Sequence, residues 1–285
     1  MNESLYRSIM VCRYRLKDRF FNRRLWITGS VFSVFLYIAE EGVRKFSIQT
    51  GEKITPWIFP FLTSDWICQM LISGYFLWLI TGFCDKKESD NYVIARAGKI
   101  IWKTGSCIAI IVAAFLYTLS LAVVSIAVLF PHVKFSLTWG KIWKTLAVID
   151  KSKYDVQINI LPSISRNNCA VEAFLKAGIL QLLCICWLAF LMYFIYDLSE
   201  KVIGIYITYV FIFLDVMLTN TMLEKFYVFS PLTLVQLGNY SIETAKYGIS
   251  FDSSIKFYLF GIVIFVSGIL FHDFIKWRKQ IGEHY

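Results

Sequence analysis

The sequence predicts an all-α, polytopic membrane protein with six transmembrane helices and little mass outside the bilayer. Of its 285 residues, 57% are hydrophobic and 18% are aromatic, whereas only 17% are charged. A soluble domain is usually about a quarter charged, and 25 Phe, 16 Tyr and 9 Trp exceed what the interior of a soluble protein of this size can hold. The charges also separate long uncharged runs. These observations argue against a soluble enzyme and against a disordered chain.

Uncharged runs bounded by charged residues define the six predicted spans. They cover Leu25–Ala39, Trp66–Cys84, Thr104–Val133, Ala177–Tyr196, Val202–Leu223 and Phe257–His272, the fifth being interrupted by Asp215. A hydrocarbon core of about 30 Å requires about 20 helical residues. The first and last runs are shorter than this and need flanking residues to complete the crossing. The chain therefore divides into an N-terminal segment, residues 1–24, and a transmembrane domain, residues 25–285.

The basic residues predict that both termini are cytoplasmic. Seven Lys or Arg precede Trp26, and positively charged flanks stay inside. With six spans the C-terminus then also lies inside, and the outer loops cover residues 40–65, 131–176 and 224–256. The net charge of +9 is assigned to cytoplasmic loops and membrane lipids rather than to nucleic acid.

The N-terminal segment predicts a basic amphipathic helix that lies in the inner headgroup layer without crossing the membrane. Its apolar positions recur every three to four residues, at Leu5, Ile9, Cys12, Leu16 and Phe20. Two interpretations follow from this spacing. The helix is either an anchor that only sets topology, or a lever that connects a cytoplasmic partner to the first span.

The cytoplasmic loop 85–103 predicts a short helix that docks a partner. A polar residue near its start caps the helix, which ends at a glycine. Its middle is more apolar than contact with solvent requires. The residues assigned to this helix are Ser89, Asp90, Tyr92, Val93, Arg96 and Gly98.

Two further short helices are predicted on the outer side. Ser230 and Pro231 provide a cap and a favoured first helical residue, and the following helix, which ends at Gly238, is too short to span. It is predicted to be re-entrant or interfacial. In loop 131–176 one helical face contains Trp139, Ile142, Trp143, Leu146 and Ile149, which predicts an interfacial helix with its tryptophans at headgroup level.

The acidic residues near the spans leave several interpretations open. Asp215 lies deep within a span, where an unpaired carboxylate is costly. It either contacts an ion or cationic substrate along a translocation path, or fixes helix packing or a subunit interface. Glu40 and Glu41 end the first span and Asp65 begins the second, so these groups are expected to meet at the outer mouth, as solvated rim charges or as part of the path.

Sequence motifs for catalysis are missing. No phosphate-binding GxxxxGK[ST], HExxH or GxSxG pattern occurs in the sequence. We therefore expect no enzymatic activity, no metal and no cofactor in this chain itself.

The order of parts and two short stretches resemble a known family. Tyr92-Val-Ile-Ala-Arg-Ala-Gly98 is similar to the Tyr-Val-x-x-Arg-x-Gly segment before the third span of type-2 ATP-binding-cassette (ABC) exporter permeases, and Phe229-Ser-Pro-Leu-Thr233 is similar to their outer Ser-Pro element. The likeness covers nearly the whole chain in topology but only these patches in sequence. The family group is linked to peptide or antibiotic efflux and immunity, and segment 131–176 is longer and more basic than in a minimal permease.

The resemblance implies a transmembrane permease subunit in a bacterial plasma membrane. Loop 85–103 would dock on two separate ATPase subunits, which bind ATP and Mg, and the path would form with a second permease, identical or paralogous. The cargo would be hydrophobic or amphipathic, such as an antimicrobial peptide or a lipid. The alternative is a non-transporting immunity or sensor protein that binds a peptide through its outer loops.

Overall fold

The computed structural model describes residues 3–85, 87–149, 154–199, 203–221, 224–240 and 242–282. In these residues all regular elements are helical, apart from one isolated bridge between Ile54 and Val133. In chain order the elements are α1 (Glu3–Arg15), η1 (Leu16–Phe20), α2 (Arg23–Ala39), α3 (Glu41–Thr50), α4 (Phe59–Ser64), α5 (Trp66–Ile80), η2 (Thr81–Phe83), α6 (Glu88–Ala97), α7 (Lys99–Val128), α8 (Gly140–Leu146), α9 (Pro162–Asn167), α10 (Ala170–Ser199), α11 (Ile203–Thr221), η4 (Glu224–Phe229), η5 (Thr233–Val235), η6 (Leu237–Asn239), α12 (Ile242–Ala245) and α13 (Phe251–Gly282).

The all-helical class is confirmed for the described residues, and four of the described helices are long and apolar enough to cross a membrane, which supports the prediction of a membrane-embedded protein. They are Trp66–Phe83, Lys99–Val128, Ala170–Ser199 and Phe251–His272. The other two predicted spans correspond to α2 and α11, which have 17 and 19 residues. At 1.5 Å per residue, α2 is about 26 Å long, slightly less than a hydrocarbon core. The count of six spans therefore stays a prediction.

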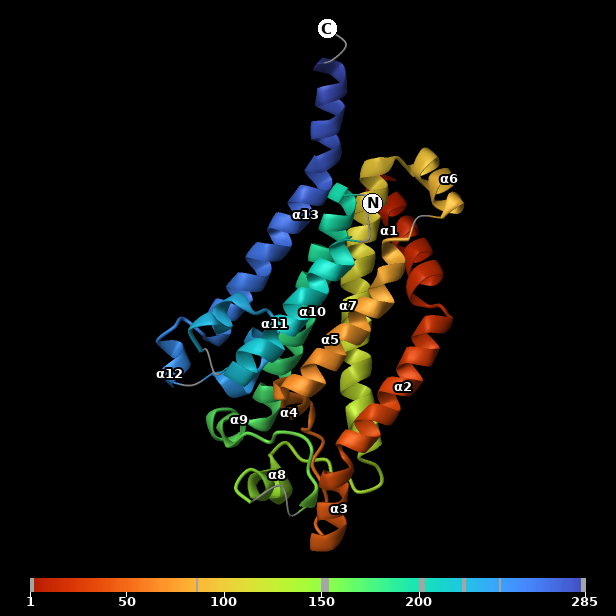
Figure 1. Cartoon of the computed structure of the whole chain (residues 1–285). Helices are drawn as coiled ribbons and strands as arrows, with labels where there is room; N and C mark the ends of the chain where they lie inside the picture. The colour runs from red at the N-terminus through yellow and green to blue at the C-terminus, as the bar shows by residue number, and fades with distance from the viewer. Residues whose placement is uncertain are drawn as a thin grey trace.

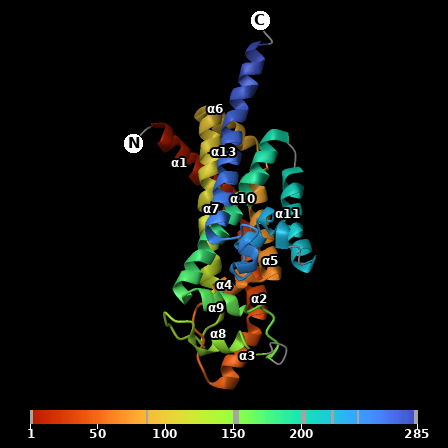
Figure 2. The ribbon, with the colours of Figure 1, turned by 90° about the vertical axis from the view of Figure 1, so that its left-hand side faces the viewer.

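The long helices form an elongated bundle with two distinct ends (Figure 1). Both termini and α6 lie at one end, here called the α6 end, whereas α3, α8 and α9 lie at the other, the α8 end. Figure 2 shows that α1 leans outward across α7 at the α6 end. This arrangement places the two termini and loop 85–103 together, as the predicted topology requires. Which end faces the cytoplasm stays a prediction.

Helix α10 lies at the centre of the bundle and packs against α5, α7, α11 and α13. It is apolar on all sides, and most of its residues from Leu180 to Tyr193 are buried. Two glycines of α13 permit the closest approach. A Cβ at Gly261 would lie 2.0 Å from the Trp187 indole nitrogen, and one at Gly268 would lie 2.3 Å from the Phe194 ring. Any side chain at these two positions would separate the two helices.

The α8 end corrects the predicted interfacial helix in loop 131–176. The helical face is right, but Trp139 and Trp143 are buried against Phe61 of α4, at ring distances of 5.3 and 5.2 Å. The indole of Trp143 donates to the Thr55 carbonyl at 3.0 Å, so its polar atom is satisfied inside the protein. The apolar face packs on α4 and on neighbouring loops rather than on lipid headgroups.

The predicted re-entrant helix after Ser230 is also different in the structure. Two short 3-10 turns, η5 and η6, replace the single helix. The backbone at Gln236 is extended (ψ 100°), which turns its side chain towards α11. The Ser230 hydroxyl accepts a bond from the Thr233 amide at 3.3 Å, so the predicted cap is present. The segment is buried beside α10 and α4.

Candidate functional site

Helix α6 forms where the sequence predicts it and ends at Gly98, whose φ of +89° favours glycine. The start of the helix differs from the prediction. Its cap position is Lys87, and Asp90, three residues later, accepts a hydrogen bond from the Lys87 amide at 3.1 Å. Ser89 is exposed and lies 3.0 Å from the Tyr14 hydroxyl.

The outer side of α6 is open. Tyr92 is 76% exposed, Arg96 is also exposed, and Val93 is half-buried. Val93 and Arg96 border a groove of about 350 Å³ between α6 and α1. The remaining lining residues are Arg7, Met10, Val11, Tyr14 and Ala97. A groove with apolar walls and two guanidinium groups suits a partner segment that combines apolar and acidic side chains.

The inner side of α6 is fastened to the N-terminal segment through Asp90. This carboxylate is buried and accepts hydrogen bonds from Arg19 at 2.5 Å and from the Tyr14 hydroxyl at 3.1 Å. Asp18 lies 2.9 Å from Arg19 and 2.6 Å from Lys87, which extends the network. Asp90 therefore faces the protein interior and is not available to a docking partner, unlike Tyr92.

The N-terminal segment packs on the bundle through part of the predicted apolar face, since Cys12 and Phe20 are buried, and through neighbouring residues that the sequence analysis did not single out. Ser8, Val11, Cys12 and Arg15 are buried against α7, while Leu5 and Ile9 of the predicted apolar face are exposed. These four buried residues recur at helical spacing, and this was the available signal. The segment is held by protein as well as by any headgroup layer.

Arg15 is the largest charged group in this contact. Its guanidinium lies 4.8 Å from the ring centres of both Phe83 and Trp102, and it donates to the Phe83 carbonyl at 2.7 Å. Burial lowers the pKa of Arg15. Cation–π contacts of a desolvated guanidinium contribute about 2 kcal/mol. Arg15 thus joins α1 to the ends of α5 and α7.

A polar cavity of about 290 Å³ lies beside Arg15 and reaches α10 and α13. In its wall the Lys103 ammonium lies 2.8 Å from Asp197, and the His272 Nδ1 atom lies 3.0 Å from the same carboxylate. Lys103 also donates to the Ile269 carbonyl at 2.9 Å. These three side chains join α7, α10 and α13 at the α6 end. The sequence analysis missed this cluster because Asp197 is separated from Lys103 by 94 residues and from His272 by 75 residues.

Asp215 serves as an acceptor for the segment between α11 and α13. Thr233 donates to it at 2.6 Å and Gln236 at 3.1 Å, and all three side chains are buried. Pro231 belongs to the same segment, and its carbonyl accepts a hydrogen bond from the Tyr258 hydroxyl. These contacts give Asp215 a packing role in the chain, and contact with a cargo or a second subunit stays a prediction.

The acidic groups expected at the outer mouth have different environments. Glu40 is completely buried, and neither of its carboxylate oxygens has a hydrogen-bond partner among the described residues. Burial raises the pKa of Glu40 well above its usual value. Glu41 is exposed and pairs with Lys45 at 2.8 Å, while Asp65 accepts from the amides of Cys68 and Asn159. Glu40 and Asp65 are therefore not solvated rim charges, and Glu41 is.

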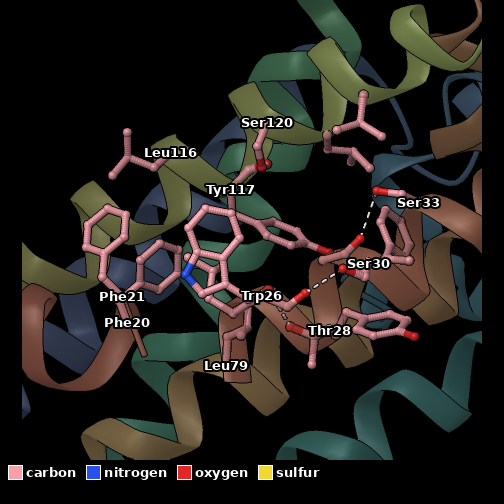
Figure 3. A pocket seen from close by; sticks show the side chains of 16 residues that line it. Phe20, Phe21, Trp26, Thr28, Ser30, Ser33, Leu79, Leu116, Tyr117 and Ser120 are labelled. Carbon is pink, nitrogen blue, oxygen red and sulfur yellow. Dashed lines mark hydrogen bonds between the residues drawn. The ribbon is translucent and has the colours of Figure 1, made fainter. Parts of the chain in front are cut away.

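Two apolar cavities flank α2 at the depth of the candidate spans. One, of about 480 Å³, lies between α2, α5 and α7 (Figure 3). The other, of about 550 Å³, lies between α2, α5 and α11. Helix α2 is thus separated from the bundle along parts of both sides.

No family model, no curated protein and no solved structure matches this chain. Within the part of the chain that the structure describes, no group of three or more His, Cys, Asp or Glu side chains is placed to hold a metal ion.

Proposed function

We propose that this chain is the permease subunit of an ATP-driven exporter in a bacterial plasma membrane, moved by separate ATPase subunits that dock at α6. The resemblance of Tyr92–Gly98 and of Phe229–Thr233 to type-2 ABC permeases supports this function. The observation that carries it is the two-sided character of α6. Tyr92 and Arg96 are presented to a partner, while Asp90 is fixed to the N-terminal segment by buried bonds.

Such a connection transmits displacement. A partner that moves α6 also moves Arg19, because the ion pair between Asp90 and Arg19 is buried and short. Arg19 lies in η1, the element that precedes α2 in the chain. The same movement reaches α7 through Gly98. We therefore favour the lever interpretation of the N-terminal segment. Hydrolysis of ATP with Mg takes place in the partner in this mechanism.

The proposed path lies between this chain and a second permease, identical or paralogous. The face of α2 and α11 supports this part of the proposal, since it exposes large apolar side chains such as Val31, Phe213 and Met217. An apolar face in a membrane protein is satisfied by lipid or by a second helix bundle. A hydrophobic or amphipathic cargo, such as an antimicrobial peptide or a lipid, suits walls of this kind.

The experiment is purification of the full chain from its native membranes with and without the double substitution Tyr92→Ala/Arg96→Ala. We expect an ATP-binding subunit to accompany the unaltered chain and to be lost from the double variant. The double substitution Phe135→Ala/Leu137→Ala removes side chains that are 71% and 77% exposed at the α8 end, and it serves as the matched control. Equal recovery of the subunit with both variants would reject docking at α6.

The alternative function, a non-transporting immunity or sensor protein, is favoured by one observation. Phe135, Leu137 and Val148 are exposed apolar side chains on a loop whose neighbouring tryptophans are firmly packed. Such a surface suits a peptide ligand. In that case no ATP-binding subunit accompanies the chain, and peptide binding is lost in Phe135→Ala/Leu137→Ala but kept in Tyr92→Ala/Arg96→Ala.

A further inference from the structure

The cavity between α2, α5 and α7 lies along two helices that are candidate membrane spans. Its walls come from two candidate spans, α5 and α7, and its end is closed by aromatic residues of the linker before α2. The lining residues are Phe20, Phe21, Leu25, Trp26, Thr28, Gly29, Ser30, Phe32, Ser33, Tyr75, Leu79, Leu116, Tyr117, Ser120, Leu121 and Val124. Its volume of about 480 Å³ lies within the range of about 300–1,000 Å³ that is usual for ligand sites.

Five of the hydroxyls in this lining already donate to backbone carbonyls. On α2, the hydroxyls of Thr28, Ser30 and Ser33 donate to backbone carbonyls one turn earlier, at 2.6, 2.9 and 2.8 Å. Figure 3 shows the bonds of Ser30 and Ser33. Opposite them, Ser120 donates to the Tyr117 carbonyl at 2.8 Å, and the Tyr117 hydroxyl donates to the Ile72 carbonyl at 2.7 Å. An occupant therefore finds mainly hydrocarbon surface, and the Trp26 indole and the Tyr75 hydroxyl are the lining donors not used by these bonds. Water does not fill such a space, because a buried water needs two to four polar partners.

The mouth of the cavity carries positive charge. Arg23 and Arg24 lie at the start of α2, between the lining residues Phe21 and Leu25, and both are exposed. Trp26, which lines the cavity, is 76% exposed, and the Arg24 guanidinium lies 5.8 Å from the ring centre of Trp78, which lines the second cavity. Tryptophan and arginine in this arrangement are typical of the headgroup level, where they meet anionic lipid phosphates. An apolar chain with an anionic head matches both parts of the site.

We propose that this cavity binds one acyl chain of an anionic phospholipid, with its phosphate at Arg23 and Arg24. The lipid completes the packing of α2 against α7, where protein side chains leave the space open. It is a resident structural ligand, distinct from any cargo. The site stands independently of the proposed export function, since its walls and charges belong to one copy of the chain.

Gly29 makes the proposal testable. A Cβ at Gly29 meets no heavy atom within 4 Å, so Gly29→Leu extends into the cavity without displacing protein. Gly178 on α10 has the same open surroundings but lines neither apolar cavity, which makes Gly178→Leu the matched control. Gly74 is equally open and lines the second cavity, so Gly74→Leu reports on that cavity instead.

The experiment places the full chain in nanodiscs that contain phosphatidylglycerol with a photoreactive acyl chain, and maps the crosslinks by mass spectrometry. We expect crosslinks at Phe21, Trp26 and Leu116. Gly29→Leu should reduce them about tenfold, the effect expected from the loss of about two buried methylenes, while Gly178→Leu and Gly74→Leu leave them unchanged. Ser120→Phe fills the cavity from α7 and gives the same result if Gly29→Leu does not purify as a monodisperse protein.

Phosphatidylcholine with the same photoreactive chain tests the headgroup. We expect weaker crosslinking than with phosphatidylglycerol, and we expect Arg23→Ala/Arg24→Ala to remove the difference. Equal labelling by the two lipids in the unaltered chain would overturn the assignment of the phosphate to these arginines. Labelling that survives both cavity-filling variants, or that disappears only in Gly74→Leu, would overturn the site itself.

Discussion

Replacing Asp90 by Ala leaves the Arg19 guanidinium buried without its closest partner. The two side chains are 3% and 4% exposed and lie 2.5 Å apart. Removal of one member of a buried pair costs about 3–5 kcal/mol. Arg19 keeps Asp18 at 2.9 Å, and Asp18 is 32% exposed, so the cost falls near the lower limit of about 3 kcal/mol.

Hydrogen exchange measured by mass spectrometry gives this value locally, at the amides of α1 and α6. A loss of about 3 kcal/mol corresponds to a decrease in protection of about a hundredfold. Asp85→Ala, which removes an exposed carboxylate just before the same helix, should leave protection unchanged. Unchanged protection in Asp90→Ala would refute the argument that this pair fastens α6.

A double-mutant cycle separates the pair from its surroundings. Arg19→Met combined with Asp90→Ala removes both charges, so no uncompensated charge remains buried. We expect the double variant to be more stable than the sum of the two single effects predicts, because contacting residues couple. Strict additivity would mean that Arg19 and Asp90 contribute to stability through other partners.

Three further predictions concern the other buried charges. Glu40→Gln should raise the thermal stability at pH 7, because the unfolded chain releases the Glu40 proton above its usual pKa of 4.5 whereas burial raises the pKa of Glu40 in the folded chain. The gain should grow by about 1.4 kcal/mol per pH unit from that value up to the folded-state pKa and vanish below the usual pKa, and a gain that persists at pH 4 would contradict the reasoning. Asp215→Ala should expose segment 230–239 to limited proteolysis, since each buried donor left without an acceptor costs about 1–3 kcal/mol, and an unchanged digest would show that the carboxylate does not hold the segment. Arg15→Met should keep the apolar packing on Trp102 but lose the charge, and we expect hydrogen exchange to show a decrease of about 2 kcal/mol in the stability of α1. An unchanged stability would show that the charge of Arg15 does not stabilise α1.

Local patterns in the sequence predicted local structure well. The uncharged runs correctly predicted the positions of the long helices, and Gly98 correctly predicted where α6 ends. The periodicity from Trp139 gave the right face of α8. These features depend on neighbouring residues, which the sequence displays directly.

Partners distant in the sequence were not predictable in the same way. A capping pattern could not reveal that Asp90 faces Arg19, which lies 71 residues away. Basic residues before a first span are normally assigned to headgroups, yet Arg15 and Arg19 are buried in protein. Likewise, an acid at the end of a span is expected in water, and only the packing around the α2–α3 turn shows that Glu40 is enclosed.

The central position of α10 has a consequence for biogenesis. Two of the helices that enclose it, α11 and α13, follow it in the chain and are therefore synthesised later. Until the ribosome has produced them, the flanks of α10 that they cover face lipid or the translocon. The amide of Gln181 has no partner among the described residues, so the hydrophobicity of the surrounding leucines must offset the cost of inserting it into the bilayer. Assembly of the bundle is consequently completed only when α13 has been synthesised and its Gly261 and Gly268 pack against Trp187 and Phe194.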